Sequence, residues 1–493
     1  MRDGPPGRRA ASALVAAATL VAMSVQLLPG PEPKVIPERR ARVLSGLPRP
    51  VERSGSWLGR TVRNPWAWLV LGLLLMYPLG IWQMYAVQHP DQHVQGHVLP
   101  GLNNDALREA VGLAAPTALV WTLLFVWLDR FRRLALWMYL VAWGWGASIA
   151  TLAAMYLNTW LGGLMMVRGA GDPAAGARAA VFSAPFVEEA CKASIVFALA
   201  VLARHRIASV LQSVTLAGLA ATGFAFTENI VYYARARVYA SYQQSAGNAD
   251  AAVASIVQLR GIYTSFGHML FTSMTGIGIG IALRTRSKLV RVLAPLTGYV
   301  LAATMHMSFN GVSSTSASTA QLMPYYYLAL GLVASVVLFL VLQSIRESRR
   351  IRQRLSDFVL MGWLDERDPV VFSSWRRRFW LLLVAARRGP RVWKPTRDLM
   401  VSMTDLAYTR DAVVRGVVDA AGDSYARTLL IDIDRLRPLA LTETEGLRLD
   451  IPWRRLGFWR RRPQAWLPPR QAAWPAPVSV RAEEWPAPPA VRR

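Results

Sequence analysis

The chain has 493 residues, of which 53% are hydrophobic, and a formal net charge of +26. Its apolar residues gather into repeated stretches of about 20, long enough to cross a bilayer core of roughly 30 Å, which excludes an ordinary soluble protein. The positive charge does not indicate nucleic-acid binding, because the arginines cluster beside the ends of the apolar stretches, as expected next to an anionic inner membrane leaflet.

The numbers of cysteine and lysine residues further limit which kind of protein this can be. The single cysteine, Cys191, excludes internal disulfides and a cysteine-based metal cluster. Only four of the 56 basic residues are lysine, and alanine is abundant, which is typical of a GC-rich bacterial genome.

The sequence predicts an all-α polytopic membrane protein with about eight transmembrane helices. Gly276 and Gly280 in the sixth span form a small-xxx-small face, which predicts close helix packing. An earlier apolar stretch at 11–29 is compatible with a further membrane segment and is not counted. The eight spans lie at roughly 66–86, 112–128, 134–159, 184–203, 208–233, 262–283, 289–310 and 322–345.

The charges of the loops predict the orientation in the membrane. Basic loops alternate with loops poor in basic residues, so the basic loops all fall on one side if both termini are cytoplasmic. The expected location is therefore the cell (inner) membrane, crossed several times. The basic segments are 34–64, 129–133, 204–207, 284–288 and 346–354, and the others are 87–111, 160–183, 234–261 and 311–321.

Four regions follow from the changes in composition. We expect a basic cytoplasmic extension at 1–65, a membrane domain at 66–345, a cytosolic region at 346–450 and a disordered Pro/Trp/Arg-rich tail at 451–493. Within the cytosolic region the sequence predicts helices at 375–387 and 404–421. The stretch 374–388 is too short to span and is expected on the inner membrane surface.

Ionisable side chains inside membrane spans cost several kcal/mol each, so each is a functional candidate. With the predicted orientation, four such groups lie within roughly 6–12 Å of the extracytoplasmic ends of spans four to seven. A shared depth predicts one site. The groups are Glu188, Glu189 and Lys192; Glu228 and Asn229; His268; and His306 with Asn310.

Helical spacing suggests roles for these residues. Glu188 and Lys192 are four apart, so we expect Lys192 to neutralise Glu188 and to leave Glu189 free as a general base. His306 and Asn310 are also four apart and can point at one atom, such as a developing oxyanion. The competing interpretation is structural, since buried polar groups also lock helices together by hydrogen bonds.

The motifs resemble the PrsW family of intramembrane peptidases over residues 66–345. That family is related to the CAAX prenyl endopeptidase and bacteriocin-processing superfamily, to which the His306/Asn310 spacing is also similar. The resemblance implies hydrolysis of a membrane-spanning protein, such as an anti-sigma factor, near the extracytoplasmic face. The ordered motifs are Glu188-Glu189-x-x-Lys192, Gly223-Phe224-Ala-Phe-x-Glu228-Asn229, Gly267-His268 and His306.

Two mechanisms and one other class of function stay open. In the first mechanism, which the family favours, zinc is held by Glu228, His268 and His306 while Glu189 activates water. In the second, a glutamate and a histidine activate water without metal, and His306 and Asn310 stabilise the oxyanion. The alternative class is a transporter or proton relay that uses the same buried groups.

The orientation is testable with reporter fusions. We expect fusions at residues 205 and 400 to report a cytoplasmic location, and fusions at residues 170, 245 and 315 to report an extracytoplasmic one. An extracytoplasmic signal at residue 205 would contradict both the orientation and the predicted depth of the site.

Overall fold

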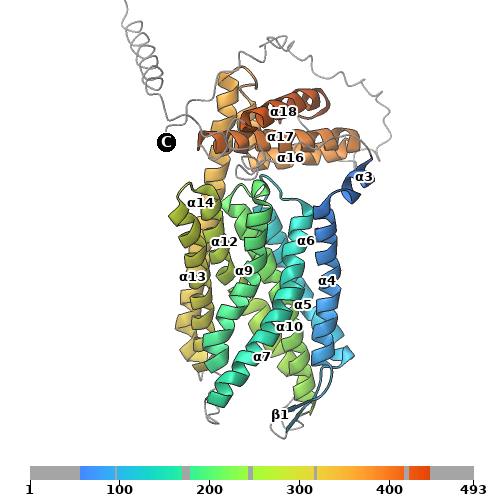
Figure 1. The fold of residues 1–493 in the computed structure, drawn as a ribbon, viewed down its shortest axis with the longest axis vertical. Coiled ribbons are helices and arrows are strands. Elements are labelled where there is room, and N and C mark those ends of the chain that lie inside the picture. The colour runs from blue at the N-terminus through green and yellow to red at the C-terminus, as the bar shows by residue number, and fades with distance from the viewer. Residues whose placement is uncertain are drawn as a thin grey trace, which may run out of the picture.

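A computed structural model describes residues 56–94, 97–168, 178–242, 248–315, 319–415 and 421–444. Long helices stand side by side as a bundle, and a smaller group of helices packs across one end of it (Figure 1). The stretch 11–29, which is compatible with a membrane segment but not counted as one, and the tail 451–493, for which disorder is expected, lie outside the described residues.

Helices account for nearly all of the bundle, which confirms the predicted all-α membrane class. A two-stranded antiparallel hairpin, β1 (Gln92–Val94) and β2 (His97–Leu99), joins the first two long helices. The helices in chain order are α3 (Trp57–Val62), α4 (Pro65–Gln88), α5 (Asn104–Leu128), α6 (Leu136–Trp145), η1 (Gly146–Ala150), α7 (Thr151–Arg168), η2 (Ala179–Ser183), α9 (Ala184–Leu202), η3 (Arg204–Arg206), α10 (Val210–Tyr242), α11 (Ala249–Val257), η4 (Gln258–Tyr263), α12 (Gly267–Arg284), α13 (Lys288–Thr315) and α14 (Thr319–Leu360).

Each of the eight predicted spans coincides with a helix or a continuous run of helices. Seven such segments in the described part of the chain are long and apolar enough to cross a membrane. The remaining one is α9, whose 19 residues include Glu188, Glu189 and Lys192. These three charges distinguish α9, which packs between α7, α10, α12 and α13 inside the bundle.

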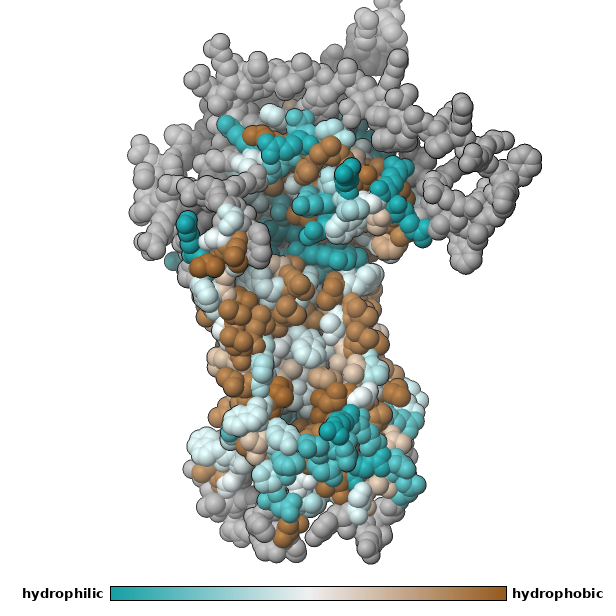
Figure 2. Space-filling model, turned by 90° about the vertical axis from the view of Figure 1, so that its right-hand side faces the viewer, coloured by the Kyte–Doolittle hydropathy of each residue, from teal (hydrophilic) through white to brown (hydrophobic). Residues whose placement is uncertain are grey.

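The surface agrees with a membrane location. On the face drawn in Figure 2, a band of hydrophobic residues crosses the middle of the bundle, with hydrophilic residues gathered above and below it. Large apolar side chains on α4 and α14 are exposed along this band, as lipid-facing positions require. The bundle therefore presents its apolar side chains outward as well as inward.

The helix α10 is the centre of the bundle. In the most apolar stretch of this helix 94% of the residues are buried, and the helix packs against α5, α6, α9 and α12. It continues to Tyr242, nine residues beyond the predicted end of the fifth span at 233. The extra length carries a polar stretch that contacts α11, so the periodicity of the apolar residues did not reveal it.

Glycines on α12 let two neighbouring helices approach closely, as predicted for Gly276 and Gly280. A Cβ atom at Gly276 would lie 3.0 Å from the backbone oxygen of Ser213 on α10, and one at Gly280 would lie 2.8 Å from Val210 Cα. On the opposite face, a Cβ at Gly278 would lie 2.2 Å from the carbonyl oxygen of Ala294 on α13. These contacts fix α12 between α10 and α13.

The region after the membrane domain folds as a helical unit at one end of the bundle. Its core joins the end of α14 to α16 and α17, with Leu355, Leu381, Leu399 and Met403 fully or almost fully buried. The predicted helix at 375–387 matches α16, whereas the one predicted at 404–421 ends earlier, at Val414 of α17. The elements are α15 (Asp368–Ser373), α16 (Trp375–Arg387), α17 (Pro390–Val414), α18 (Ala421–Leu436) and η5 (Arg437–Leu439).

An ion-pair cluster ties this unit to the bundle. Asp411 of α17 lies 2.9 Å from Arg415, 3.3 Å from Arg284 at the end of α12 and 3.4 Å from Arg354 of α14. Burial alone would raise the pKa of Asp411, but the surrounding arginines hold it below its ordinary value. The carboxylate thus stays ionised and links three helices.

Packing at the α12–α13 contact can be tested with Gly278→Ala. The added methyl group must push α13 away, which we expect to cost about 1–3 kcal/mol and to lower the thermal unfolding midpoint in detergent. Gly72→Ala is the matched control, because a Cβ there meets nothing within 4 Å. Equal midpoints for the two variants would contradict the close packing.

Candidate active site

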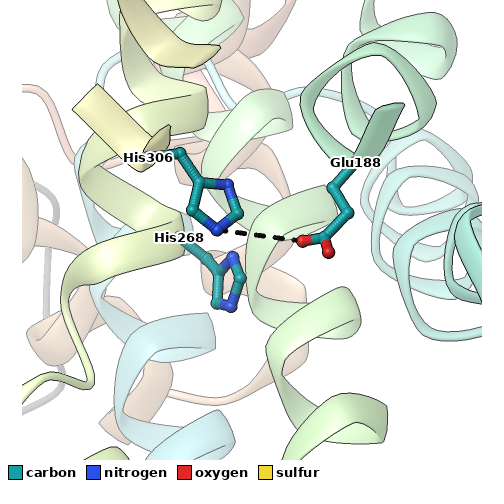
Figure 3. Close-up of side chains that lie close together, drawn as sticks. All are labelled: Glu188, His268 and His306. Carbon is teal, nitrogen blue, oxygen red and sulfur yellow. Dashed lines mark ion pairs between the residues drawn. The ribbon is translucent and has the colours of Figure 1, made fainter. Parts of the chain in front are cut away.

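Four helices bring the predicted polar groups together in the half of the bundle away from α15–α18. Glu188, Glu189 and Lys192 come from α9, Glu228 from α10, His268 from α12 and His306 from α13. Figure 3 shows Glu188, His268 and His306 pointing toward one another from their three helices. The distances between their side chains show which groups hold the site in place and which remain free.

Lys192 is fully buried at the centre of the network. Its Nζ atom donates a hydrogen bond to Oε1 of Glu189 over 2.6 Å and lies 3.0 Å from Nδ1 of His268. The ammonium also sits 4.4 Å from the centre of the Phe224 ring, a cation–π contact. Its distance to Oε2 of Glu188 is longer, 3.9 Å.

Both carboxylate oxygens of Glu189 have hydrogen-bond partners within the protein. Glu189 has no exposed surface. Besides the bond from Lys192, its Oε2 accepts from the Thr272 hydroxyl over 2.7 Å, and its Oε1 lies 3.1 Å from Nδ1 of His306. The expectation that Lys192 leaves Glu189 free is therefore wrong, because the ammonium lies closer to Glu189 than to Glu188.

Glu188 is the carboxylate with a free oxygen. Its Oε1 accepts from the amide of Asn158 on α7 over 3.3 Å. Its Oε2 is buried without a hydrogen-bond partner in the described part of the chain and faces Nε2 of His306 at 3.9 Å. Since Nδ1 of His306 bonds to Glu189, Nε2 carries a lone pair in the neutral ring. Two acceptors thus face each other.

The second histidine is held by a charged pair. Nε2 of His268 donates to Oε2 of Glu228 over 2.7 Å, and Arg260 of η4 contacts the same oxygen at 2.7 Å. Arg260 also donates to Oδ1 of Asn229 over 2.9 Å. The carboxylate therefore orients the imidazole, while Arg260 balances its charge.

Asn310 has a different partner from the one its spacing suggested. Its amide donates to the backbone oxygen of Ala180 in η2 over 3.1 Å, and not toward the centre shared by the histidines. The side chain still lines the cavity described next, one turn beyond His306.

A cavity of about 340 Å³ opens beside these groups. Glu188, Glu228, His268 and His306 line it, whereas Glu189 and Lys192 lie behind its wall. Small side chains from α5, α7 and the start of α9, including Ala114, Gly162 and Ala184, leave the space free. Two of the eight predicted site residues, Glu189 and Lys192, therefore do not line the cavity.

Sequence reasoning missed three members of this network. Thr272 lies four residues after His268, so the same helical spacing that drew attention to other pairs could have found it. Asn158 is a polar residue within the third apolar span, which is itself a signal. Arg260 falls within the predicted outer loop 234–261. Its neighbours in sequence do not indicate that η4 places its side chain beside Glu228.

The donor set for a metal also differs from the prediction. One ligand atom from each of Glu188, His268 and His306 lies within 4.8 Å of the others. The sequence suggested Glu228 as the third ligand, but its Oε2 atom is occupied by His268 and Arg260. The structure therefore groups Glu188 with the two histidines.

Buried carboxylates and imidazoles beside a cavity within a helical membrane bundle are the groups that a membrane hydrolase or a proton relay uses. Residues 135–342 match the family described as PrsW family intramembrane metalloprotease. The match confirms the resemblance and identifies a peptidase, which favours hydrolysis over a transporter or proton relay. A metalloprotease family implies a metal ion.

Two other comparisons found no match. No curated protein and no solved structure matches this chain. The family match, which spans α6 to the first half of α14, includes every ionisable residue of the site and leaves the α15–α18 unit outside it.

The different environments of the two neighbouring glutamates predict opposite effects on stability. Glu189→Gln leaves Lys192 without its closest counter-ion, and breaking a buried pair costs about 3–5 kcal/mol. Glu188→Gln keeps that pair and is expected to unfold within about 1 kcal/mol of the wild type. Thermal unfolding of the two purified variants in one detergent measures the difference. A less stable Glu188→Gln variant would reverse the assignment.

Proposed function

We propose that this chain is an intramembrane endopeptidase that cleaves a membrane-spanning protein at the cavity between α9, α10, α12 and α13. The observation that carries this proposal is the unpartnered Oε2 of Glu188 opposite Nε2 of His306. Two facing acceptors need a cation or a donor between them, and hydrolysis of a peptide bond supplies a role for either.

The residues of the cavity fit a metal ion. Three carboxylates face two cations, Lys192 and Arg260, so with neutral imidazoles the centre carries one excess negative charge. Glu188, His268 and His306 would hold the ion, a ligand set of two histidines and one glutamate that is ordinary for zinc. Ligand atoms around tetrahedral zinc lie roughly 3.4 Å apart, so the present spacing of up to 4.8 Å requires only side-chain movement.

When bound, the metal would polarise the scissile carbonyl and make a water molecule nucleophilic at neutral pH. The protein residues fix the geometry around it. Glu189 orients His306 and Glu228 orients His268, the arrangement of carboxylates behind metal-binding imidazoles. Lys192 contacts Nδ1 of His268, so a cation at that nitrogen would compete with the ammonium.

The cavity also offers acceptors for a peptide backbone. Oδ1 of Asn158 is buried without a hydrogen-bond partner in the described residues, close to Glu188. A substrate N–H group would satisfy this oxygen, because unpaired buried acceptors cost free energy until a donor arrives. The small residues that line the cavity leave room for an extended segment, so we propose that the substrate helix unwinds locally before cleavage.

The place of cleavage follows from the proposed orientation. With the basic loops and both termini in the cytoplasm, the site lies near the extracytoplasmic face of the inner membrane. A bacterial membrane-anchored regulator, such as an anti-sigma factor, is the substrate type that the family resemblance suggests. Residues 346–450 would then form a cytosolic domain.

The activity is tested by comparing membrane proteins of cells that express the wild type or Glu188→Gln. We expect at least one truncated membrane protein to appear only with the wild type, because the variant lacks the free carboxylate of the cavity. Arg346→Gln, an exposed change on α14 outside the site, is the control and should retain cleavage. Identical fragment patterns for all three proteins would contradict the proposal.

Metal dependence is a separate prediction. Purified wild-type protein should contain about one equivalent of metal, lose cleavage with a membrane-permeant chelator and regain it with added zinc. The His306→Gln variant should contain less metal. Full cleavage by protein without stoichiometric metal would remove the ion from the mechanism and leave Glu188 and a histidine to activate water.

A further inference from the structure

A second cavity lies on the outside of the bundle, between α5, α12 and α14. Its volume is about 590 Å³, and its walls are mostly apolar. Val337 and Val341 of α14 are about half exposed, so the cavity is an open groove toward the lipid. We call it the α5–α14 groove; its walls include Trp121, Leu124, Leu270, Val333, Val337 and Leu340.

The groove runs along α14. It follows α14 from Val333 to Arg349, a length of roughly 24 Å at 1.5 Å per residue. Its mostly apolar walls therefore offer a path for an extended chain along α14.

One end of the groove is basic and aromatic. The guanidinium of Arg130 lies 4.3 Å from the centre of the Trp127 ring and 5.8 Å from that of Trp375. Its Nη2 donates to the Ser344 hydroxyl. Arg349, which is exposed, lines the same end.

The remaining donors of Arg130 lack acceptors. Its Nε and Nη1 atoms are buried without a hydrogen-bond partner in the described part of the chain. Stacking on aromatic rings satisfies the face of a guanidinium and leaves its N–H edge unpaired, which is costly when buried. Phosphate oxygens match this edge, since they accept two parallel hydrogen bonds from arginine.

We propose that the α5–α14 groove binds an anionic phospholipid, with an acyl chain along α14 and the phosphate at Arg349 and Arg130. The phosphate meets the exposed Arg349 first and reaches the edge of Arg130 when the Trp375 ring, 42% exposed, turns outward. Basic pockets between membrane helices commonly take such headgroups. In the proposed orientation this headgroup belongs to the inner leaflet.

The bound lipid would support the active site from outside. Met269 lines both the groove and the site cavity, and it follows His268 directly on α12. An acyl chain against this wall fills space beside the helix that carries His268.

Native mass spectrometry of the full-length protein in detergent tests this proposal. Dioleoyl phosphatidylglycerol and dioleoyl phosphatidylcholine are titrated separately, since they differ only in headgroup. We expect the wild type to prefer phosphatidylglycerol. Arg130→Gln should weaken that lipid about fivefold, and a double change with Arg349→Gln about 25-fold, with phosphatidylcholine unaffected. The control Arg346→Gln, which removes a charge from the same helix outside the groove, should bind like the wild type.

Two outcomes would overturn the proposal. One is equal affinity for both lipids in the wild type, or an unchanged preference in the double variant when gel filtration shows intact folding. The other comes from Val337→Trp, which fills the groove and should displace phosphatidylglycerol. If this variant keeps lipid binding but loses proteolysis, the groove serves the substrate helix instead.

Discussion

The ion pair between Lys192 and Glu189 is the constraint on which the site depends. Both side chains are completely buried in a helix surrounded by other membrane helices, where an isolated charge would cost several kcal/mol. Each therefore needs its partner, and the remaining bonds of each go to neighbouring helices: Thr272 and His306 for Glu189, and His268 for Lys192. The pair thereby fixes the position of α9 against α12 and α13.

The same pair determines which groups remain available for chemistry. Because Glu189 takes Nδ1 of His306, the other ring nitrogen turns to Glu188, whose Oε2 has no partner among the described residues. The central helix α10 contributes Glu228 to His268, and the glycines of α12 keep both neighbouring helices close enough for these bonds. Structure and proposed chemistry thus depend on one arrangement of charges.

Most of the fold could be predicted from the sequence, because a membrane span has a length and composition that are visible locally. All eight expected spans are helical, including α9, which carries three charged residues. The members of the site could be found for the same reason: an ionisable residue in an apolar span is conspicuous.

The pairing within the site could not be predicted. Glu188 and Glu189 are four and three residues before Lys192, and both spacings bring side chains together on a helix. Only the rotation of α9 against α12 and α13 decides between them, and rotation depends on packing contacts that are distant in sequence. Arg260 and Asn158 were missed for a related reason, since their partners come from other helices.

The central claim is that Glu188, His268 and His306 form one metal centre within the membrane. X-ray absorption at the zinc edge of the purified, active protein measures it directly, because scattering from imidazole rings reports how many histidines bind the ion. The account predicts two imidazoles with oxygen ligands in the wild type and one imidazole in His268→Gln. A spectrum without imidazole scattering, or one that His268→Gln leaves unchanged, would contradict it.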